Sequence, residues 1–328
     1  MSTDRKIRVA VVGAGDFGRN HVRVWRELGD AELVGIVDAD AARAGNVAAE
    51  FGTQVIADVR DLASMRVDAV SLAVPTVEHG RIGTQLLEQG IDVMVEKPIA
   101  ASLAEADQLI ASARRNGRIL QVGHLERFNP AVVATMKIVT QPLFFEVHRL
   151  GVFTPRSLDV DVVYDVMIHD LDILLALVKA PVMDLKAVGI PVLTDKVDIA
   201  HARIEFATGA VANVTASRVS TERVRKMRFF QEREYISVDY TRQDALRIHV
   251  EGAAVSPQIN FEKLPTESEE PLRAELRAFL ESVRTRRAPL VDGAAGRQAL
   301  ELADRVMAGI LDHARRVQLG AFAPQDAP

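Results

Sequence analysis

The sequence contains no cysteine among its 328 residues, which excludes disulfides, thiolate nucleophiles and Cys-ligated metal sites. A reducing, cytoplasmic setting is therefore the location we expect. Long apolar runs are also lacking: the longest, Ile173 to Val178, has six residues, whereas a membrane-spanning helix needs about twenty. The N-terminus has no apolar stretch followed by a small-residue cleavage site, so we expect neither a membrane span nor a signal peptide.

An excess of positive charge is missing as well. Lys and Arg number 40 against 45 Asp and Glu, which leaves a net charge of −5. Such a chain has no general attraction to phosphate backbones, so nucleic-acid binding is not expected. Hydrophobic residues at 48% and charged residues at 26% indicate a globular protein, and the length predicts about two domains.

In the first 120 residues, short apolar runs alternate with amphipathic stretches of helical length. The predicted strands are Ile7–Val12, Glu32–Val37, Ala69–Val74, Asp92–Val95 and Ile119–Val122. The predicted helices are Phe17–Leu28, Ala41–Phe51, Val77–Gln89 and a fourth between a capping box at Ser102–Glu105 and a left-handed stop at Asn116–Gly117. This alternation indicates right-handed crossovers and a doubly wound parallel sheet, an α/β domain.

The remaining chain has consecutive strands with short links, which favours a mostly antiparallel sheet in an α+β domain. The predicted strands are Leu143–Leu150, Asp184–Leu193, Ala200–Phe206, Ala210–Val219, Arg228–Val238 and Leu246–Val250. Predicted helices cover about 165–178, Pro271–Arg286 and Gly293–Val317. The predicted division is 1–122 for the first domain, 123–318 for the second, and 319–328 for a flexible tail.

A glycine-rich turn follows the first predicted strand and opens the first predicted helix. Its residues Gly13-Ala-Gly15-Asp-Phe-Gly18 have the form G-x-G-x-x-G, and the next strand ends at Asp38. In this strand–turn–helix context the motif predicts a dinucleotide site, with the pyrophosphate at the helix N-terminus. The alternative is an ordinary turn between strand and helix.

Asp38 bears on the choice of cofactor. Its carboxylate suits the adenosine ribose hydroxyls and would repel a 2′-phosphate. Ala39 and Asp40 supply no compensating cation, and Arg43 is treated as a distant partner. NAD is therefore predicted rather than NADP.

Lys97, in Glu96-Lys97-Pro98, follows the fourth predicted strand at its carboxyl end, where open α/β sheets bind ligands. This lysine is a candidate for bonding a substrate oxygen. The alternative is a surface lysine paired with Glu96.

The apolar helix near residue 165 has one polar stripe, formed by Asp165, His169 and Asp172 at i, i+4 and i+7. A histidine with a carboxylate one turn away is a natural general acid/base pair. A metal site and a buried structural histidine are the other readings. No second His or Cys motif lies nearby to support a metal.

Several polar groups fall near the predicted domain boundary. His124, Arg127 and Asn129 follow the last strand of the first domain, and Arg149 and Arg156 precede the 165 helix. Arginine suits bidentate recognition of phosphate, although each arginine alone also fits a solvated surface.

Taken together, these motifs resemble the Gfo/Idh/MocA family of NAD(P)-dependent oxidoreductases over nearly the whole chain. The matching segments are Gly13–Gly18 with His21, Pro75–His79, Glu96–Pro98 and Asp165–His169. The resemblance implies a Rossmann domain, an open-faced antiparallel sheet domain, and a last helix that packs back on the first domain. It also implies that Lys97, Asp165 and His169 are catalytic. The cofactor residues it implies are Gly13, Gly15, Asp16, Phe17, Gly18, Asp38, Val74, Pro75, His79, Glu96 and Lys97.

Within the family, Gly123–Pro130 and Met167–Asp172 look like the branch that oxidises the C3 hydroxyl of UDP-N-acetylglucosamine. The substrate contacts expected from this resemblance and the stripe are Lys97, His124, Arg127, Asn129, Arg156, Asp165 and His169. A dehydrogenase of a free sugar or cyclitol, or a non-catalytic NAD-binding redox sensor, are the alternatives. His169 is the expected base, and Lys97 would exchange roles with it if strongly desolvated. An uncovered apolar sheet face predicts a homodimer or homotetramer.

Overall fold

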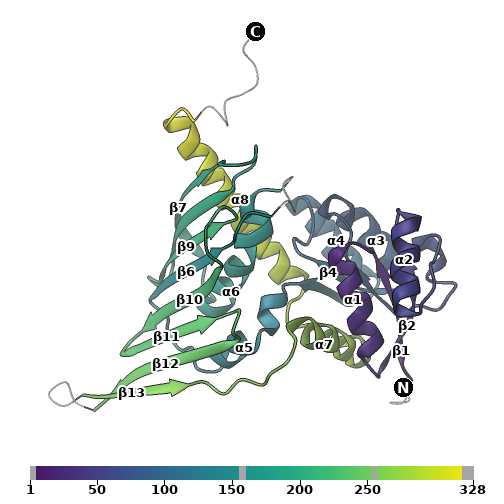
Figure 1. Ribbon diagram of the computed structural model, residues 1–328, viewed down its shortest axis with the longest axis horizontal. Coiled ribbons are helices and arrows are strands. Elements are labelled where there is room, and N and C mark those ends of the chain that lie inside the picture. Colours follow the sequence, from purple (N-terminus) through teal and green to yellow (C-terminus); the bar gives the residue numbers. More distant parts are fainter. Residues whose placement is uncertain (1–4, 155–159, 253–256, 320–328) are drawn as a thin grey trace, which may run out of the picture. The chain divides into compact units, whose positions relative to one another are not determined.

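The structure is a computed structural model that describes residues 5–154, 160–252 and 257–319 (Figure 1). It divides into two compact units. Unit 1 contains the chain up to Phe128 together with Glu269–Arg297, and unit 2 contains Asn129–Ser268 and the chain from Gln298 onward. The sequence predicts one continuous first domain that ends at residue 122, whereas unit 1 also includes the later segment Glu269–Arg297. The predicted tail lies outside the described residues, apart from residue 319.

Unit 1 is built on a five-stranded, all-parallel sheet with the order β2-β1-β3-β4-β5. The strands are β1 (Ile7–Val12), β2 (Ala31–Val37), β3 (Ala69–Leu72), β4 (Asp92–Glu96) and β5 (Leu120–Gly123). The helices are α1 (Asp16–Glu27), α2 (Ala41–Phe51), α3 (His79–Glu88), α4 (Leu103–Arg115) and α7 (Pro271–Thr285). The predicted doubly wound parallel sheet is confirmed.

Helix α7 belongs to this unit because its apolar face completes the core. Leu276, Phe279 and Leu280 are fully buried and pack in one cluster with Val22 and Trp25 of α1. At its C-terminus, Arg286 makes a bidentate ion pair with the buried Asp92 at the start of β4. A helix about 150 residues later in the sequence therefore closes one side of the sheet.

Unit 2 contains an eight-stranded sheet with the order β13-β12-β11-β10-β6-β9-β8-β7. The strands are β6 (Phe144–Leu150), β7 (Val182–Ile190), β8 (Ile199–Phe206), β9 (Val211–Ser217), β10 (Val224–Gln231), β11 (Glu234–Asp239), β12 (Asp244–Glu251) and β13 (Gln258–Lys263). All neighbouring strands are antiparallel except β6 and β9. The mostly antiparallel sheet is confirmed.

One expected strand, Arg228–Val238, is wrong. It is a hairpin of β10 and β11, joined by Glu232 and Arg233. Arg233 has φ +59°, a left-handed conformation that lets the chain reverse within two residues. The apolar pattern continues through both strands, so it does not by itself predict the turn of charged residues between them.

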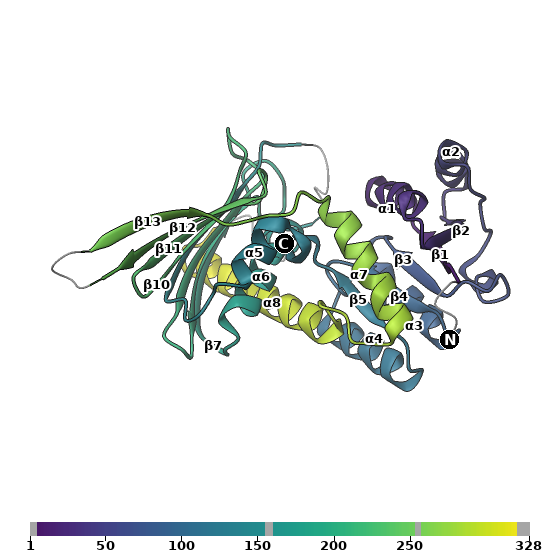
Figure 2. The ribbon, with the colours of Figure 1, turned by 90° about the horizontal axis from the view of Figure 1, so that it is seen from below.

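Helices lie against one face of this sheet (Figure 2). They are α5 (Pro130–Met136), α6 (Ile168–Val178) and the later part of α8 (Gly293–Arg316). Alternate strand residues such as Phe145 and Phe229 point into the resulting core and are completely buried. No helix among the described residues of the unit covers the opposite face, where Phe230 is 36% exposed and Phe261 71%.

Candidate active site

The glycine-rich turn joins β1 to α1, and its three glycines differ in what surrounds them. Gly13 has φ +98°, and a Cβ there would lie 2.3 Å from the carbonyl oxygen of Ala73. A Cβ on Gly18 would lie 1.8 Å from the carbonyl oxygen of Gly13. Both positions therefore exclude a side chain. Gly15 instead faces open space, with no atom within 4 Å of a Cβ placed on it.

That open space adjoins the N-terminus of α1. Gly15 is the N-cap residue of this helix and makes no side-chain cap hydrogen bond. Asp16 and Phe17 occupy the turn and are exposed. A helix N-terminus beside an open glycine offers backbone N–H groups and the positive end of the helix dipole to a pyrophosphate, which is the arrangement that a dinucleotide requires.

Asp38 follows β2 and is tied to this turn. Its carboxylate accepts the backbone N–H of Ala14 at 2.5 Å and that of Asp40 at 2.8 Å. Arg43, in the first turn of α2, pairs with it through Nη2 at 2.6 Å and Nε at 3.1 Å. The expectation that Arg43 is distant is therefore wrong: one helical turn brings its guanidinium back to the carboxylate.

The electrostatics of Asp38 follow from these contacts. Burial alone would raise the pKa of this carboxyl, but the Arg43 guanidinium and the two backbone donors hold it below its ordinary value. Asp38 is therefore ionised at neutral pH. A cation and an anion stand together at the end of β2, where the adenosine ribose of a dinucleotide binds.

The segment after β3 is held by a buried histidine. His79 places Nδ1 2.9 Å from the carbonyl oxygen of Pro98 and Nε2 3.0 Å from that of Val74. Burial lowers its pKa. Each ring nitrogen faces a backbone carbonyl, and the neutral imidazole donates its single N–H to one of the two. His79 therefore lies between the loops that carry Val74 and Lys97, and its contact with a cofactor stays a prediction.

Lys97 follows directly after β4 and is half-buried. The preceding Glu96 faces His21 of α1, with 3.0 Å between Oε1 and Nε2. Burial would raise the pKa of Glu96, whereas His21 and Lys97 keep it below its ordinary value. Gly123 of β5 leaves room for this carboxylate, because a Cβ there would lie 2.9 Å from Oε1. The lysine thus stands beside an ionised, anchored carboxylate.

The expected substrate residues after β5 differ in burial. His124 is buried and Arg127, in a 3-10 turn, is half-buried. Asn129 is 2% exposed: its Oδ1 accepts the N–H of Ala131 at the start of α5, and its Nδ2 donates to the carbonyl of Tyr240 at 3.0 Å. Asn129 is the N-cap of α5, and Asn followed by Pro is a recognisable helix start. Its contact with a diphosphate stays a prediction.

Arg149 also has a structural role. Its guanidinium makes a bidentate pair with Asp170, at 2.7 and 2.9 Å, and lies over the ring of Tyr240. Arg149 is 5% exposed and Asp170 1%. This cation is already paired in the interior of unit 2 and is not presented to a phosphate. Arg156, the other predicted cation, lies outside the described residues.

The expected polar stripe does not run along a regular α-helix. Val163–Met167 forms a π-helical turn, in which Ile168 donates its N–H to the carbonyl of Val163 five residues earlier. Asp165 lies in this turn, and His169 is the second residue of α6. Both are half-buried, whereas Asp172 is 2% exposed. Unit 2 thus presents a carboxylate and an imidazole near the junction of the π-turn and α6.

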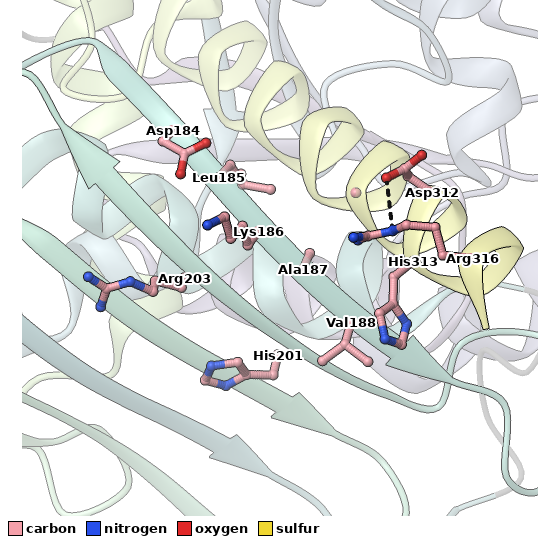
Figure 3. A pocket seen from close by; sticks show the side chains of 11 residues that line it. Asp184, Leu185, Lys186, Ala187, Val188, His201, Arg203, Asp312, His313 and Arg316 are labelled. Carbon is pink, nitrogen blue, oxygen red and sulfur yellow. Dashed lines mark ion pairs between the residues drawn. The ribbon is translucent and has the colours of Figure 1, made fainter.

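The described residues contain no group of three or more His, Asp or Glu side chains that could hold a metal ion. Unit 2 has a cavity of about 570 Å³ beside β7, β8 and the end of α8 (Figure 3). None of the predicted site residues lines it. Charged side chains around it include Lys186, Arg203 and Arg316, the last paired with Asp312.

Comparison with known proteins supplies the family. Residues 7–124 match the model of an oxidoreductase family with an NAD-binding Rossmann fold, and residues 145–237 match the Gfo/Idh/MocA C-terminal domain. The chain is 37% identical over 308 residues to UDP-N-acetylglucosamine 3-dehydrogenase of Acidithiobacillus ferrooxidans, covering 93% of this chain and 97% of that protein. The chain belongs to the Gfo/Idh/MocA oxidoreductase family.

Other Gfo/Idh/MocA similarities agree with the fold. A solved structure of the A. ferrooxidans enzyme has a TM-score of 0.87 at 35% identity, covering 93% of this chain and 98% of that one. The scyllo-inositol 2-dehydrogenase (NAD(+)) of Bacillus subtilis is 29% identical over 236 residues, 66% of this chain and 69% of that enzyme. A levoglucosan dehydrogenase with NADH shares the fold, with a TM-score of 0.83 at 19% identity over 94% of this chain and 98% of that one.

Family membership confirms the predicted NAD-binding Rossmann domain and the second, mostly antiparallel domain. It also confirms that the protein is an NAD-dependent oxidoreductase. In the residues that the structure describes, no helix is long and apolar enough to cross a membrane.

Proposed function

We propose that this enzyme oxidises the C3 hydroxyl of UDP-N-acetylglucosamine, or of a closely related nucleotide sugar, with NAD as hydride acceptor. The similarity to the A. ferrooxidans enzyme carries this proposal, because it extends over 93% of the chain and therefore through both units. The B. subtilis inositol dehydrogenase matches a smaller share, 66%. When bound, NAD would supply the electrophilic ring that accepts the hydride, and the cradle at Gly15 would hold its pyrophosphate.

The base is assigned to unit 2. A carbinol carbon releases hydride only when its hydroxyl proton is removed, so the site needs a base at that oxygen. A free imidazole has a pKa of about 6.5 and a free lysine about 10.4, which favours histidine for this task near neutral pH. His169 is half-buried at the start of α6, and Asp165 precedes it by four residues. In the proposal Asp165 stabilises the imidazolium formed on His169.

The cation is assigned to unit 1. Oxidation of an alcohol develops negative charge on its oxygen, and a fixed ammonium stabilises that charge. Lys97 lies at the carboxyl end of β4. His21 contacts the carboxylate of Glu96 before it, and His79 contacts the carbonyl oxygen of Pro98 after it. In the proposal Lys97 therefore bonds the reacting oxygen. His124 and Arg127 remain candidates for the sugar and the diphosphate, and Arg156 is a third.

The test is an anaerobic incubation of the purified enzyme with NAD and one of three substrates, followed by NADH absorbance. UDP-N-acetylglucosamine should give NADH, whereas N-acetylglucosamine and scyllo-inositol should give much less. Turnover of the free sugar or the cyclitol at a comparable kcat/KM would replace the proposed substrate class. Tight NAD binding without turnover of any candidate would favour a redox sensor.

We further propose that the enzyme is a homodimer or homotetramer assembled through the open face of the unit 2 sheet, and that it acts in the cytoplasm. An apolar row across neighbouring strands supports the assembly. Each of its residues is the register partner of the next one on the adjacent strand, in the order Phe144, Phe230, Tyr235, Ile248 and Phe261. Phe230 stacks against Phe144 at 5.8 Å between ring centroids, and the ring of Tyr235 is tilted against Phe230 at 5.3 Å. A row of this kind on an uncovered sheet face suits a second copy related by two-fold symmetry.

A further inference from the structure

A π-helical turn, Val163–Met167, precedes α6, so Asp165 lies in the π-turn and His169 in the α-helix. A π-turn has one more residue than an α-helical turn, is rare, and occurs frequently at functional sites. The relation between Asp165 and His169 therefore differs from the i, i+4 stacking of a regular α-helix that the sequence predicts. Something other than helix propensity must therefore hold Val163–Met167 in this form.

One anchor lies immediately before Asp165. The hydroxyl of Tyr164 donates to Oδ1 of Asp304, on α8, at 2.8 Å. Tyr164 and Asp304 are both half-buried. Burial and the nearby carboxylate raise the pKa of Tyr164, so the phenol keeps its proton and remains a donor.

A second anchor lies immediately after His169. Asp170 is the residue paired with Arg149 of β6, in the interior of unit 2. Hydrogen bonds with an ionised donor and acceptor in a bidentate pair fix orientation as well as distance. The pair therefore limits both rotation and sliding of the first turn of α6.

The start of the π-turn is held as well. Val162 donates its N–H to the carbonyl of Val197 at 2.9 Å, and Val197 donates back to Oδ1 of Asp161 at 2.8 Å. Three separate elements of unit 2 thus bond to the segment 161–170: the stretch before β8, the helix α8, and the strand β6.

We propose that Tyr164 and Asp304 are positioning residues, whose hydrogen bond holds the π-turn so that Asp165 is placed correctly for His169. The proposal rests on the assignment of Asp165 and His169 as catalytic. Neither Tyr164 nor Asp304 needs to touch the substrate. The Arg149–Asp170 pair holds the other end of the same segment, so loss of the tyrosine hydroxyl should loosen the turn while α6 stays in place.

The experiment compares variants that each delete or keep one hydrogen bond. Tyr164→Phe removes only the hydroxyl, and Asp304→Leu removes its acceptor. Asp304→Asn keeps an oxygen that accepts from the phenol. Thr135→Val is the matched control: it deletes one buried hydroxyl of unit 2, which donates to the carbonyl of Ala131 at 2.7 Å within α5.

We expect kcat with UDP-N-acetylglucosamine to fall about 10- to 100-fold in Tyr164→Phe and Asp304→Leu, because small displacements of reacting groups have effects of this order. Affinity for NAD should stay at the wild-type value. Asp304→Asn should recover most of the activity, and Thr135→Val should keep it. A kcat for Tyr164→Phe within about twofold of Thr135→Val would overturn the proposal, as would an Asp304→Asn as slow as Asp304→Leu.

A second measurement separates this inference from the proposed function. Amide hydrogen exchange of residues 162–170 should be faster in Tyr164→Phe than in Thr135→Val, whatever the substrate is. If the wild-type enzyme does not oxidise UDP-N-acetylglucosamine, the proposed function fails while this comparison still tests the anchor. Equal exchange rates in the two variants would refute the positioning role.

Discussion

Replacement of Asp38 should change cofactor selectivity in a way that depends on Arg43. In the Asp38→Ala variant the ribose loses a charged hydrogen-bond acceptor. Such a bond contributes about 1.5–3 kcal/mol, and a tenfold change in affinity corresponds to about 1.4 kcal/mol. We therefore expect NAD to bind about 10- to 150-fold more weakly.

The same substitution should improve the relative binding of NADP. The variant removes a carboxylate that repels a 2′-phosphate, and it releases the guanidinium now held at 2.6 and 3.1 Å from that carboxylate. Arginine binds phosphate through two parallel hydrogen bonds. Asp38→Ala should therefore raise the NADP-to-NAD affinity ratio, and the double variant Asp38→Ala/Arg43→Ala should lose most of that gain.

The assay is a fluorescence titration of NADH and NADPH into each variant. Asp40→Ala is the control, because it removes a carboxylate two residues away that caps α2 through the N–H of Arg43 at 3.0 Å. Its cofactor ratio should match the wild type. Since the pKa of Asp38 lies below its ordinary range, the wild-type preference should also be constant between about pH 6 and 8. A wild-type enzyme that prefers NADP, or an equal ratio in the single and double variants, would refute this reasoning.

Three other outcomes are expected. Lys97→Ala and His169→Ala should each lower kcat by about 10²- to 10⁴-fold while NAD still binds, and near-normal kcat in His169→Ala would make the polar stripe structural. Arg149→Ala should lower the free energy of unfolding in denaturant by about 3–5 kcal/mol, because it leaves Asp170 buried without its cation. The double variant Arg149→Met/Asp170→Leu should lose clearly less stability. Equal losses in the two variants would contradict the interpretation of a buried ion pair. Phe230→Glu should sediment as a monomer at micromolar concentration. The control Leu290→Glu, at an exposed position of unit 1, should keep the wild-type assembly. A wild-type protein that sediments as a monomer would exclude the assembly.

The first domain could be predicted from sequence because each local signal agrees with the global fold. The Gly13–Gly18 turn, the capping box at Ser102 and the alternation of strands and helices all require the same doubly wound sheet. Helix α7 is the exception. Its amphipathic pattern predicts a helix, but nothing local shows that Leu276 and Phe279 are buried 250 residues away from Trp25 in sequence. Such long-range packing is not encoded in periodicity.

At the site, sequence reasoning identified residue types better than their partners. Arg149 and Asn129 are polar and lie near the predicted domain boundary, which suggests contacts with phosphate, and the family resemblance implies a cofactor contact for His79. The structure instead pairs Arg149 with Asp170, and Asn129 and His79 with backbone groups. A free arginine and a paired one look alike in sequence, because the pairing residue lies in a different element.

Burial divides the predicted site residues into two groups, and the division agrees with the proposed mechanism. A side chain that moves a proton or binds a sugar must remain reachable, whereas one that holds a loop gains strength from being enclosed. His79, Asn129 and Asp172 are nearly inaccessible, at 1%, 2% and 2% exposure, while Lys97 and His169 are half-buried. The enclosed polar residues hold the elements on which the accessible ones stand: His79 bonds the loop of Lys97, and Asp170 bonds the helix of His169. In the proposed mechanism, the accessible residues Lys97 and His169 therefore depend on enclosed polar groups that hold their elements in place.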